Sequence, residues 1–211
     1  LKGLRYRMNF GPDLSYSRDG VYIDANSVAN GGSTSYAALI DYKVFSYTLD
    51  NLLYYDKTIG DHSFGVTLLQ SQTQYQRDTS SITGNGVPVP SQLWNALTSG
   101  TITGQLSTSS NTLKQNLLSY MARVNYSYKD KYLLTVSARQ DGSSVLAEGH
   151  KYDWFPSAAV AWRISRENFM NASWINDLKL RFGVGVTGNS AIKPYQTLGG
   201  VSSLFYPFVS S

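Results

Sequence analysis

Few residues in this sequence have the types and spacing that catalysis or metal binding requires. His62 and His150 are far apart and lack HxxxH or HxxE spacing, so we predict solvated histidines and no metal site. Cysteine is absent, which removes thiol nucleophiles, disulfides and Cys metal ligands. Ser143 follows Asp141 and a glycine, but it does not lie in a GxSxG turn. The acidic residues are dispersed, and nothing singles out a carboxylate pair for glycoside hydrolysis. We therefore expect no enzyme activity and no cofactor.

Three glycines near the C-terminal end could be mistaken for a phosphate-binding loop. Gly183 and Gly185 fall on the polar side of an alternating segment, Gly188 follows shortly after, and no helix is expected next. Glycine inside a strand is more typical of a bend or of close backbone packing. We therefore interpret these glycines as structural.

Alternation of apolar and polar residues with period two predicts an all-β chain. In the clearest example, Leu180 and Phe182 fall on one face, whereas Lys179 and Arg181 fall on the other. The first strand is expected at 4–10, and it either ends at Pro12 or continues with a bulge there to Tyr16. Further strands are expected at 42–56, 62–77, 116–129, 132–141, 154–164 and 177–187. An eighth strand is expected to start near Leu204.

The connections alternate between short and long. Short turns are expected at 57–61 and 129–131, and loops at 18–41, 78–114, 142–153 and 188–203. The connection 165–176 falls on the short-turn side but is long for a turn, with a helical turn at Arg166–Met170. Within the longest loop we expect a short helix over 90–97, with Ser91 as its N-cap.

The composition favours a membrane barrel without deciding the matter. Charged residues make up 15% of the chain, against about 25% in soluble domains. The 16 tyrosines and four tryptophans suit girdles at a membrane surface. The sequence contains no run of about 18 apolar residues, so a transmembrane helix is not predicted. The basic residues are scattered, so a nucleic-acid interface is not predicted. The expected strands are longer than the usual 5–6 residues, but a β-sandwich shows the same alternation.

Four segments resemble the barrel of the SusC/RagA family of TonB-dependent outer-membrane importers of Bacteroidetes. They are YLLTVSARQDGSS (132–144), WFPSAAVAWRIS (154–165), ENFM (167–170) and LKLRFGVGVTGN (178–189). Their order and spacing also match, and the segment at 47–74 is similar too, so the resemblance covers most of the chain. Val145 and Leu146 depart from the family pattern, which often has a basic residue and a Phe after DGSS.

The resemblance implies an antiparallel, up-and-down transmembrane β-barrel. Residues 1–211 would supply an arc of seven or eight strands of a 22-stranded barrel, and we expect the chain to be a fragment without the plug. The family imports oligosaccharides or peptides together with a SusD-like surface lipoprotein that acts as a lid. TonB, which would act through the missing N-terminal region, supplies the energy. The implied location is the outer membrane, with lipid around the barrel, the short turns in the periplasm and the long loops outside.

In such a barrel one polar face lines the lumen. We expect this lumen set to comprise Arg123, Asn125, Arg139, Asp141, Lys179 and Arg181. These residues either contact the substrate or the plug, or form a cross-strand ladder that braces the wall; we favour bracing. Trp94, in the longest loop, is either an exposed platform on which a sugar stacks or is packed under its own loop. Our candidate substrate contacts are Trp94, Arg123, Asn125, Arg139, Asp141 and Arg181.

Two alternatives belong to other classes of protein. A secreted or surface β-sandwich that binds glycans or acts as an adhesin would use Trp94 and loop tyrosines, and would be soluble without detergent. An outer-membrane barrel enzyme would need a catalytic cluster at the loop end, and the sequence shows none.

Overall fold

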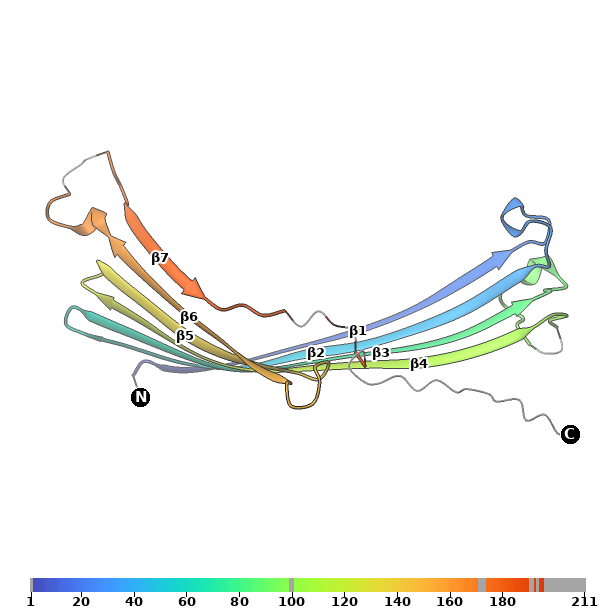
Figure 1. Ribbon diagram of the computed structural model, residues 1–211, viewed down its shortest axis with the longest axis horizontal. Helices are drawn as coiled ribbons and strands as arrows, with labels where there is room; N and C mark the ends of the chain where they lie inside the picture. The colour runs from blue at the N-terminus through green and yellow to red at the C-terminus, as the bar shows by residue number, and fades with distance from the viewer. Residues whose placement is uncertain (1, 99–100, 171–173, 190–191, 193, 196–211) are drawn as a thin grey trace, which may run out of the picture. The chain divides into compact units, whose positions relative to one another are not determined.

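The part of the chain that the structure describes folds into one sheet of seven strands that follow one another in sequence order, β1-β2-β3-β4-β5-β6-β7 (Figure 1). The computed structural model describes residues 2–98, 101–170, 174–189, 192, 194 and 195. The strands are β1 (Leu4–Ile23), β2 (Tyr36–Ile59), β3 (His62–Asn85), β4 (Leu106–Tyr128), β5 (Tyr132–Ser143), β6 (Tyr152–Arg163) and β7 (Lys179–Gly185). Three short 3-10 helices, η1 (Val28–Asn30), η2 (Pro90–Gln92) and η3 (Ile164–Arg166), lie in connections. None of the helices in these described ranges could cross a membrane.

This topology confirms the predicted all-β, up-and-down arrangement. Among the described residues every strand belongs to the single sheet, whereas a β-sandwich packs two sheets face to face. The β-sandwich alternative is therefore not supported. The eighth strand expected near Leu204 lies outside the described residues.

The contacts divide the chain into two compact units. Unit 1 comprises 1–4, 54–68 and 117–211, and unit 2 comprises 5–53 and 69–116. Unit 1 thus holds the short turns and β5 to β7, while unit 2 holds most of β1 and the parts of β2 to β4 that lead to the longest loops.

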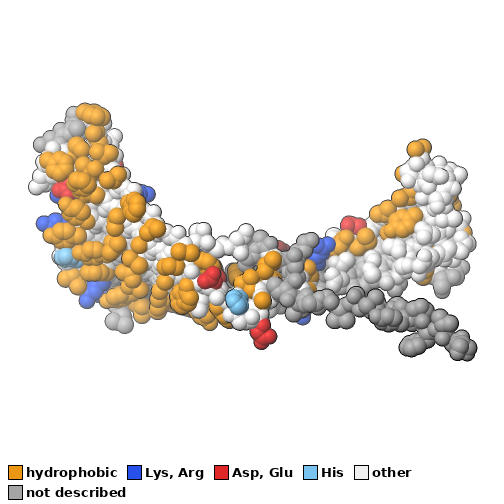
Figure 2. All heavy atoms as spheres, viewed as in Figure 1, with side chains coloured by type: hydrophobic (Ala, Val, Ile, Leu, Met, Phe, Trp, Pro, Cys, Tyr) orange, Lys and Arg blue, Asp and Glu red, His pale blue; other side chains and the backbone are white. Residues whose placement is uncertain are grey.

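The strand register in unit 1 sorts side chains into two faces. Tyr126 pairs with Leu134, Leu134 with Val160, and Val160 with Phe182, so these four side chains form one row. We call this side the apolar face; hydrophobic side chains gather over this part of the chain in Figure 2. The opposite side, the polar face, carries the residues between them: Arg123, Asn125, Thr135, Ser137, Arg139, Asp141, Asp153, Ser157, Arg181, Gly183 and Gly185.

Both predicted short turns are present and tight. Gly60 and Asp61 alone connect β2 to β3, and Gly60 has φ 58°. In the β4–β5 turn Lys129 and Asp130 have φ 50° and 53°, and the Lys131 N–H donates to the Tyr128 carbonyl at 3.0 Å. Two consecutive positive φ values define the type I′ turn, whose twist matches that of antiparallel strands.

The predicted strand boundaries were wrong at the loop side, because the strands extend much further. The loop expected at 18–41 is reduced to 24–35, the loop at 78–114 to 86–105, and β4 begins at Leu106. Polar side chains pair across the extra length: Ser81 with Ser109 at 2.8 Å, and Thr112 with Asp78 at 2.8 Å. The added ends of β3 and β4 have no apolar alternation, so hydrophobic periodicity gives no signal there.

The helix expected over 90–97 was also wrong. The segment forms only the 3-10 helix η2, its N-cap is Val89 rather than Ser91, and no side chain caps it. Leu93, with φ 53°, ends the helix. The helical turn expected at Arg166–Met170 lies partly in η3, and it continues through a hydrogen bond from the Met170 N–H to the Glu167 carbonyl at 3.0 Å.

Unit 2 has a small core of its own, formed where the long loops meet the strands. Ala37, Val87 and Ile102 are buried, and Tyr22, Trp94, Leu97 and Leu106 pack against them. The Ser35 hydroxyl donates to the Val87 carbonyl at 3.1 Å, and the Gly86 N–H donates to the Ser35 carbonyl at 2.7 Å. The loop 86–105 is therefore a packed element of this unit.

Gly20 on β1 provides a test of this core, because a Cβ there would overlap the Trp94 indole. We expect Gly20→Val to displace Trp94 at a cost of about 1–3 kcal/mol. That cost predicts an increase of at least about fivefold in protease cleavage within 86–105 of the full-length protein. Gly11→Val on the same strand is the control, because a Cβ at Gly11 has nothing within 4 Å. Equal cleavage of the two variants would contradict the packing.

Candidate functional site

A hollow of about 660 Å³ lies in unit 1 at the ends of β5 and β6 remote from the 129–131 turn. Its walls come from β5, the 144–151 loop, β6 and the segment that follows β7. The side chains that give it chemical character are Arg139, Asp141, Ser143, His150, Asp153 and Phe155. A concave site with a few convergent polar groups is the usual form of a ligand site.

Arg139 and Asp141 form an ion pair within the hollow. They lie two residues apart on β5, so their side chains share the polar face. Arg139 Nε donates to Asp141 Oδ1 at 2.6 Å, and its Nη2 donates to Ser119 Oγ on β4 at 3.0 Å. The ion pair lies within β5, and of these two contacts only the hydrogen bond from Arg139 to Ser119 joins β5 to β4. The two charged side chains remain 40% and 26% exposed.

Asp153 on β6 faces Asp141 directly across the β5–β6 pair. Like charges at opposed positions destabilise a sheet, and Arg139 offsets this for Asp141. Asp153 Oδ1 accepts a hydrogen bond from the Trp154 N–H at 2.8 Å. The remaining carboxylate oxygens can accept hydrogen bonds from hydroxyl or amide donors of a ligand.

Ser143 lies beside these carboxylates with an unsatisfied hydroxyl. Its side chain is on the same face of β5 as Asp141, and the residue is only 3% exposed. Ser143 Oγ has no hydrogen-bond partner in the part of the chain that the structure describes. A buried polar group without a partner is costly, so this hydroxyl is an unsatisfied group in the wall of the hollow.

Two glycines let aromatic rings close the walls of the hollow. A Cβ at Gly188 would overlap the Phe155 ring, and one at Gly142 would overlap the Tyr152 ring. The Val186 N–H also donates to the Pro156 carbonyl at 3.0 Å, which holds the segment after β7 against β6. These contacts give Gly188 a packing role, as predicted, and β7 places Gly183 and Gly185 inside a strand.

The structure gathers two of the six predicted contact residues, Arg139 and Asp141, into the hollow. Arg123 and Asn125 lie exposed on β4 on the same face, and Asn125 Oδ1 accepts from Thr135 Oγ1 at 2.9 Å. Arg181 is exposed on β7 opposite Ala161. Trp94 is partly buried in the core of unit 2, in agreement with the packed alternative. No residue of this set is shown to contact a substrate, so those roles stay predictions.

Sequence reasoning missed three residues of the hollow: Ser143, Asp153 and Phe155. The polar alternation of β5 beyond Asp141 already placed Ser143 on the right face, and Phe155 belongs to the recognised WFPS segment. Asp153 joins them only through the β5–β6 register, which the sequence alone does not give.

The histidines behave differently from each other. His150 is exposed and lines the hollow. His62 is exposed but not merely solvated: its Nδ1 lies 2.7 Å from the Tyr126 hydroxyl, and its ring lies 4.8 Å from that of Tyr128. Within the described ranges no group of three or more His, Cys, Asp or Glu residues could hold a metal ion.

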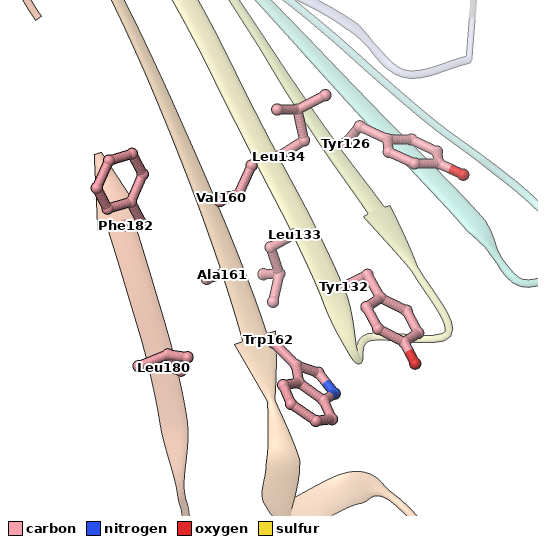
Figure 3. Close-up of a pocket in the computed structure, with 9 residues that line it drawn as sticks. All are labelled: Tyr126, Tyr132, Leu133, Leu134, Val160, Ala161, Trp162, Leu180 and Phe182. Atoms are coloured by element: carbon pink, nitrogen blue, oxygen red, sulfur yellow. The ribbon is translucent and has the colours of Figure 1, made fainter. Parts of the chain in front are cut away.

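A row of aromatic side chains follows the short-turn end of the apolar face. We define the aromatic row as His62, Phe64, Tyr126, Tyr128, Tyr132 and Trp162. Phe64 and Tyr126 have ring centroids 5.0 Å apart, and those of Tyr128 and Tyr132 are 6.4 Å apart. Beside the row, an open hollow of about 390 Å³ has almost wholly apolar walls that include Leu134, Val160, Leu180 and Phe182 (Figure 3).

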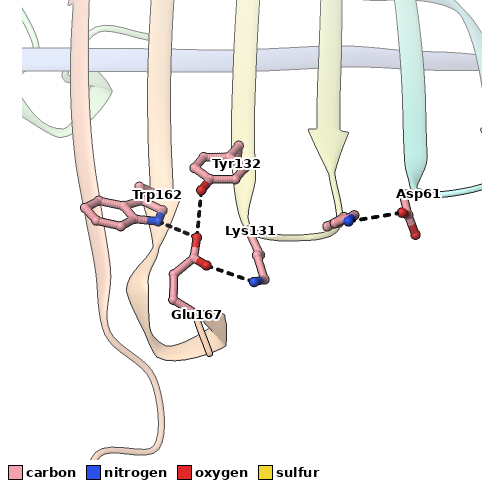
Figure 4. A network of polar contacts seen from close by, with 6 residues as sticks. Asp61, Lys131, Tyr132, Trp162 and Glu167 are labelled. Atoms are coloured by element: carbon pink, nitrogen blue, oxygen red, sulfur yellow. Dashed lines mark hydrogen bonds and ion pairs between the residues drawn. The ribbon is translucent and has the colours of Figure 1, made fainter. Parts of the chain in front are cut away.

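Glu167, in the β6–β7 connection, ties that connection to the row (Figure 4). Its carboxylate accepts hydrogen bonds from Lys131 Nζ at 2.8 Å, Tyr132 Oη at 2.8 Å and Trp162 Nε1 at 3.0 Å. The side chain is only 13% exposed. The Lys131, Trp162 and Tyr132 donors, in that order of effect, lower the pKa of Glu167 from 4.5 to about 2.

Known proteins similar to this chain are TonB-dependent receptors. TonB-dependent receptor P3 of Formosa agariphila is 32% identical over 207 residues, which cover 97% of this chain and 20% of that protein. TonB-dependent receptor SusC of Bacteroides thetaiotaomicron is 30% identical over 198 residues, which cover 89% of this chain and 19% of that protein. The chain thus spans about a fifth of the length of these relatives. No protein-family model matches it.

Solved structures share the fold. The RagAB peptide importer in its 'closed-closed' state superposes with a TM-score of 0.84 at 21% identity, covering all of this chain and 23% of that one. The 'open-open' state gives the same values. At this identity the likeness concerns the fold.

The lowered pKa of Glu167 predicts a pH dependence of stability. A depressed carboxyl pKa means that the charged form stabilises the fold above pH 4.5 and that this contribution is lost as the pH falls towards 2. We expect Glu167→Gln to lower the melting temperature at pH 7, and the difference from wild type at pH 3 to be less than about half as large.

Thermal unfolding of the full-length protein by circular dichroism measures both differences. Glu148→Gln is the control, because Glu148 is exposed in the 144–151 loop, and it should leave melting unchanged at both pH values. A Glu167→Gln effect that is equal at pH 7 and pH 3 would disprove the ionic role.

Proposed function

Because this chain belongs to the SusC/RagA type of TonB-dependent receptor, we propose that it forms part of the wall and outer loops of an outer-membrane importer. Receptors of this type are outer-membrane β-barrels that serve nutrient import. The importer takes up oligosaccharides or peptides, with a SusD-like lipoprotein as lid on the loop side and TonB acting from the periplasm. We assign all of 1–211 to the barrel domain, and the plug and the TonB-contacting segment to other parts of the receptor.

The exposed apolar face is the observation that carries this proposal. Phe182 and Leu180 are 72% and 62% exposed, and both belong to the face that continues across β4 to β6. A soluble protein rarely leaves such a continuous surface uncovered, whereas a barrel turns it to lipid. The aromatic row at the short-turn end then lies at the periplasmic membrane surface, where barrels carry an aromatic girdle.

The polar face becomes the lumen in this orientation, and the hollow lies at its extracellular end. Asp141, Asp153 and the Ser143 hydroxyl would meet a substrate as it enters from the lid. Carboxylates and hydroxyls can accept or share hydrogen bonds with sugar hydroxyls or peptide amides. Arg123, Asn125 and Arg181 lie on the same face and would contact the passing substrate or the plug. Similarity to receptors supports a transport role without chemistry of its own.

Growth of a strain lacking the receptor gene tests this function. On a panel of single polysaccharides and peptide mixtures as sole nutrient, we expect the deletion to abolish growth on one source and wild-type receptor to restore it. The double variant Asp141→Asn, Asp153→Asn should raise the half-saturating nutrient concentration by at least about tenfold, because each change replaces a hydrogen bond to a charged group (about 1.5–3 kcal/mol) by one to a neutral amide (about 0.5–1.5 kcal/mol).

Asp61→Asn is the matched control, since it removes a carboxylate at the exposed β2–β3 turn, outside the hollow. It should restore growth like the wild-type receptor. If the deletion strain grows normally on every source, the import function is wrong. If the double variant matches the control, the hollow is not on the substrate path.

A further inference from the structure

β4 is paired on one side only along the part that follows the longest loop. β5 pairs with β4 from Leu117, opposite Ser143, as far as Tyr128. The earlier residues of β4 therefore have β3 on one side and, within the described ranges, no strand on the other. We call the segment 106–114, which belongs to unit 2, the open edge.

The open edge is exposed on both faces of the strand. All six residues of 107–112 are exposed, whichever way their side chains point. The facing part of β3, which is joined to it by the Ser81–Ser109 and Asp78–Thr112 hydrogen bonds, is mostly half-buried. This difference arises because β3 has a neighbour on each side, whereas the open edge has only one.

Alternation along the strand decides which backbone groups of the open edge lack a partner. The Gln105 carbonyl accepts from the Asn85 N–H of β3 at 3.0 Å, so the backbone groups of the next residue point away from β3. The Tyr128 carbonyl, which accepts from the Lys131 N–H on the β5 side, has the same phase. The groups that point away from β3 and have no backbone partner among the described residues are those of Leu106, Thr108, Ser110, Thr112 and Lys114.

The open edge lacks the features that normally prevent an edge from pairing with another chain. Such features are proline, charged side chains, a bulge or a covering element. The segment 106–114 contains no proline, and Lys114 is its only charged residue. It spans about 30 Å, at about 3.3 Å per residue. An unprotected edge of this length can receive an extended segment as an additional strand.

A further strand of the same barrel has no place at the open edge. The strands follow one another in sequence order, so β3 and β5 already occupy the two positions beside β4. Additional strands of an up-and-down barrel join beyond β1 and β7. The partner of the open edge therefore comes from outside the barrel wall.

The exposed side chains of the open edge favour a transient ligand over a permanent protein partner. Residues 107–112 are all serine, threonine or asparagine. Stable protein interfaces depend on apolar cores and aromatic anchors, and this run offers neither. Binding here must rely on hydrogen bonds of the main chain, which do not depend on the ligand's side chains. A ligand of variable sequence that binds and leaves meets this requirement.

We propose that the open edge binds an extended peptide by strand addition, and that the importer's substrates therefore include peptides. A peptide presents N–H and C=O groups with the same spacing as the open edge, whereas an oligosaccharide has no such repeating backbone amides. The inference rests on the proposed import function and selects one of its two substrate classes. It adds a binding site on the loop side of unit 2 to the hollow of unit 1.

Hydrogen exchange of the full-length receptor, followed by mass spectrometry, tests the site directly. The probe is a peptide of about nine residues with alternating alanine and threonine, which is long enough to cover the open edge. Its analogue with N-methyl groups on every internal residue is the control, because methylation removes the donors and prevents a strand from approaching. We expect saturating peptide to slow exchange over 106–114 by at least about tenfold, since a bound amide exchanges only after the peptide has left. The methylated analogue should leave exchange unchanged.

A pair of variants at one position separates the backbone from the side chain. Ser110→Pro removes an N–H that points away from β3, and an edge strand tolerates proline at such a position. We expect it to weaken the apparent affinity for the peptide by at least about fivefold. Ser110→Ala, which keeps the N–H, should bind like the wild type. Unchanged exchange in β3 shows that the proline variant is folded, and the methylated peptide tests the site without any change in the receptor.

The outcomes distinguish this inference from the function on which it rests. If 106–114 already exchanges slowly without peptide, another part of the receptor covers the edge and the inference is wrong. It is also wrong if the peptide has no effect on exchange, or if the purified surface lipoprotein slows exchange in its place. The growth panel decides the import function separately: a deletion that impairs growth on a polysaccharide but on no peptide source would confirm import and overturn the peptide site.

Discussion

The exposed apolar face of β4 to β7 is the constraint on which unit 1 depends. A single sheet cannot bury one of its own faces, so Leu134, Val160 and Phe182 need an apolar environment from outside. The backbone meets the same environment by pairing every strand with its neighbours in sequence order. A short turn places two consecutive strands side by side. The type I′ turn at Lys129 and Asp130 is such a turn and contains no glycine.

The two ends of unit 1 differ in where their polar atoms lie. At the turn end, polar atoms of Tyr132 and Trp162 turn to Glu167, so that their rings remain on the apolar face. At the loop end, the polar face carries the opposed carboxylates of Asp141 and Asp153, and Arg139 neutralises Asp141. One end thus hides its polar atoms from an apolar surface, and the other leaves them available to a polar ligand.

Periodicity predicted the fold well and the boundaries poorly, for one physical reason. The short-turn ends alternate between apolar and polar residues, because one face there is apolar, and this gave the turns and the strand starts at His62 and Tyr132. Towards the loops both faces are polar, and the strands are held by pairs such as Ser81 with Ser109 at 2.8 Å. Such pairs have no sequence period, so periodicity does not distinguish these strand ends from loops.

The candidate site could be predicted from the sequence only in part. The face of Arg139 and Asp141 followed from β5 alone, whereas Asp153 required the register of a second strand. For Trp94 the sequence leaves two interpretations, because an aromatic residue in a polar loop can be either a binding platform or part of a core beneath the loop. Its packing on Ala37, Val87 and Ile102 distinguishes the two.

The glycines of β7 show how the polar face shapes its own surface. A Cβ at Gly185 would lie 3.0 Å from Ser157 Cβ, and one at Gly183 would lie 3.4 Å from Ala159 Cβ. The first contact is tight, so that a side chain there would require Ser157 to move by a few tenths of an ångström, and the second is an ordinary contact. Because β6 has small side chains and β7 has glycines here, no large side chain projects from this part of the polar face. On the apolar face of β7 the neighbouring residues Val184 and Phe182 are large. The same strand thus has a thin polar surface and a bulky apolar one, as the proposed wall between water and lipid requires.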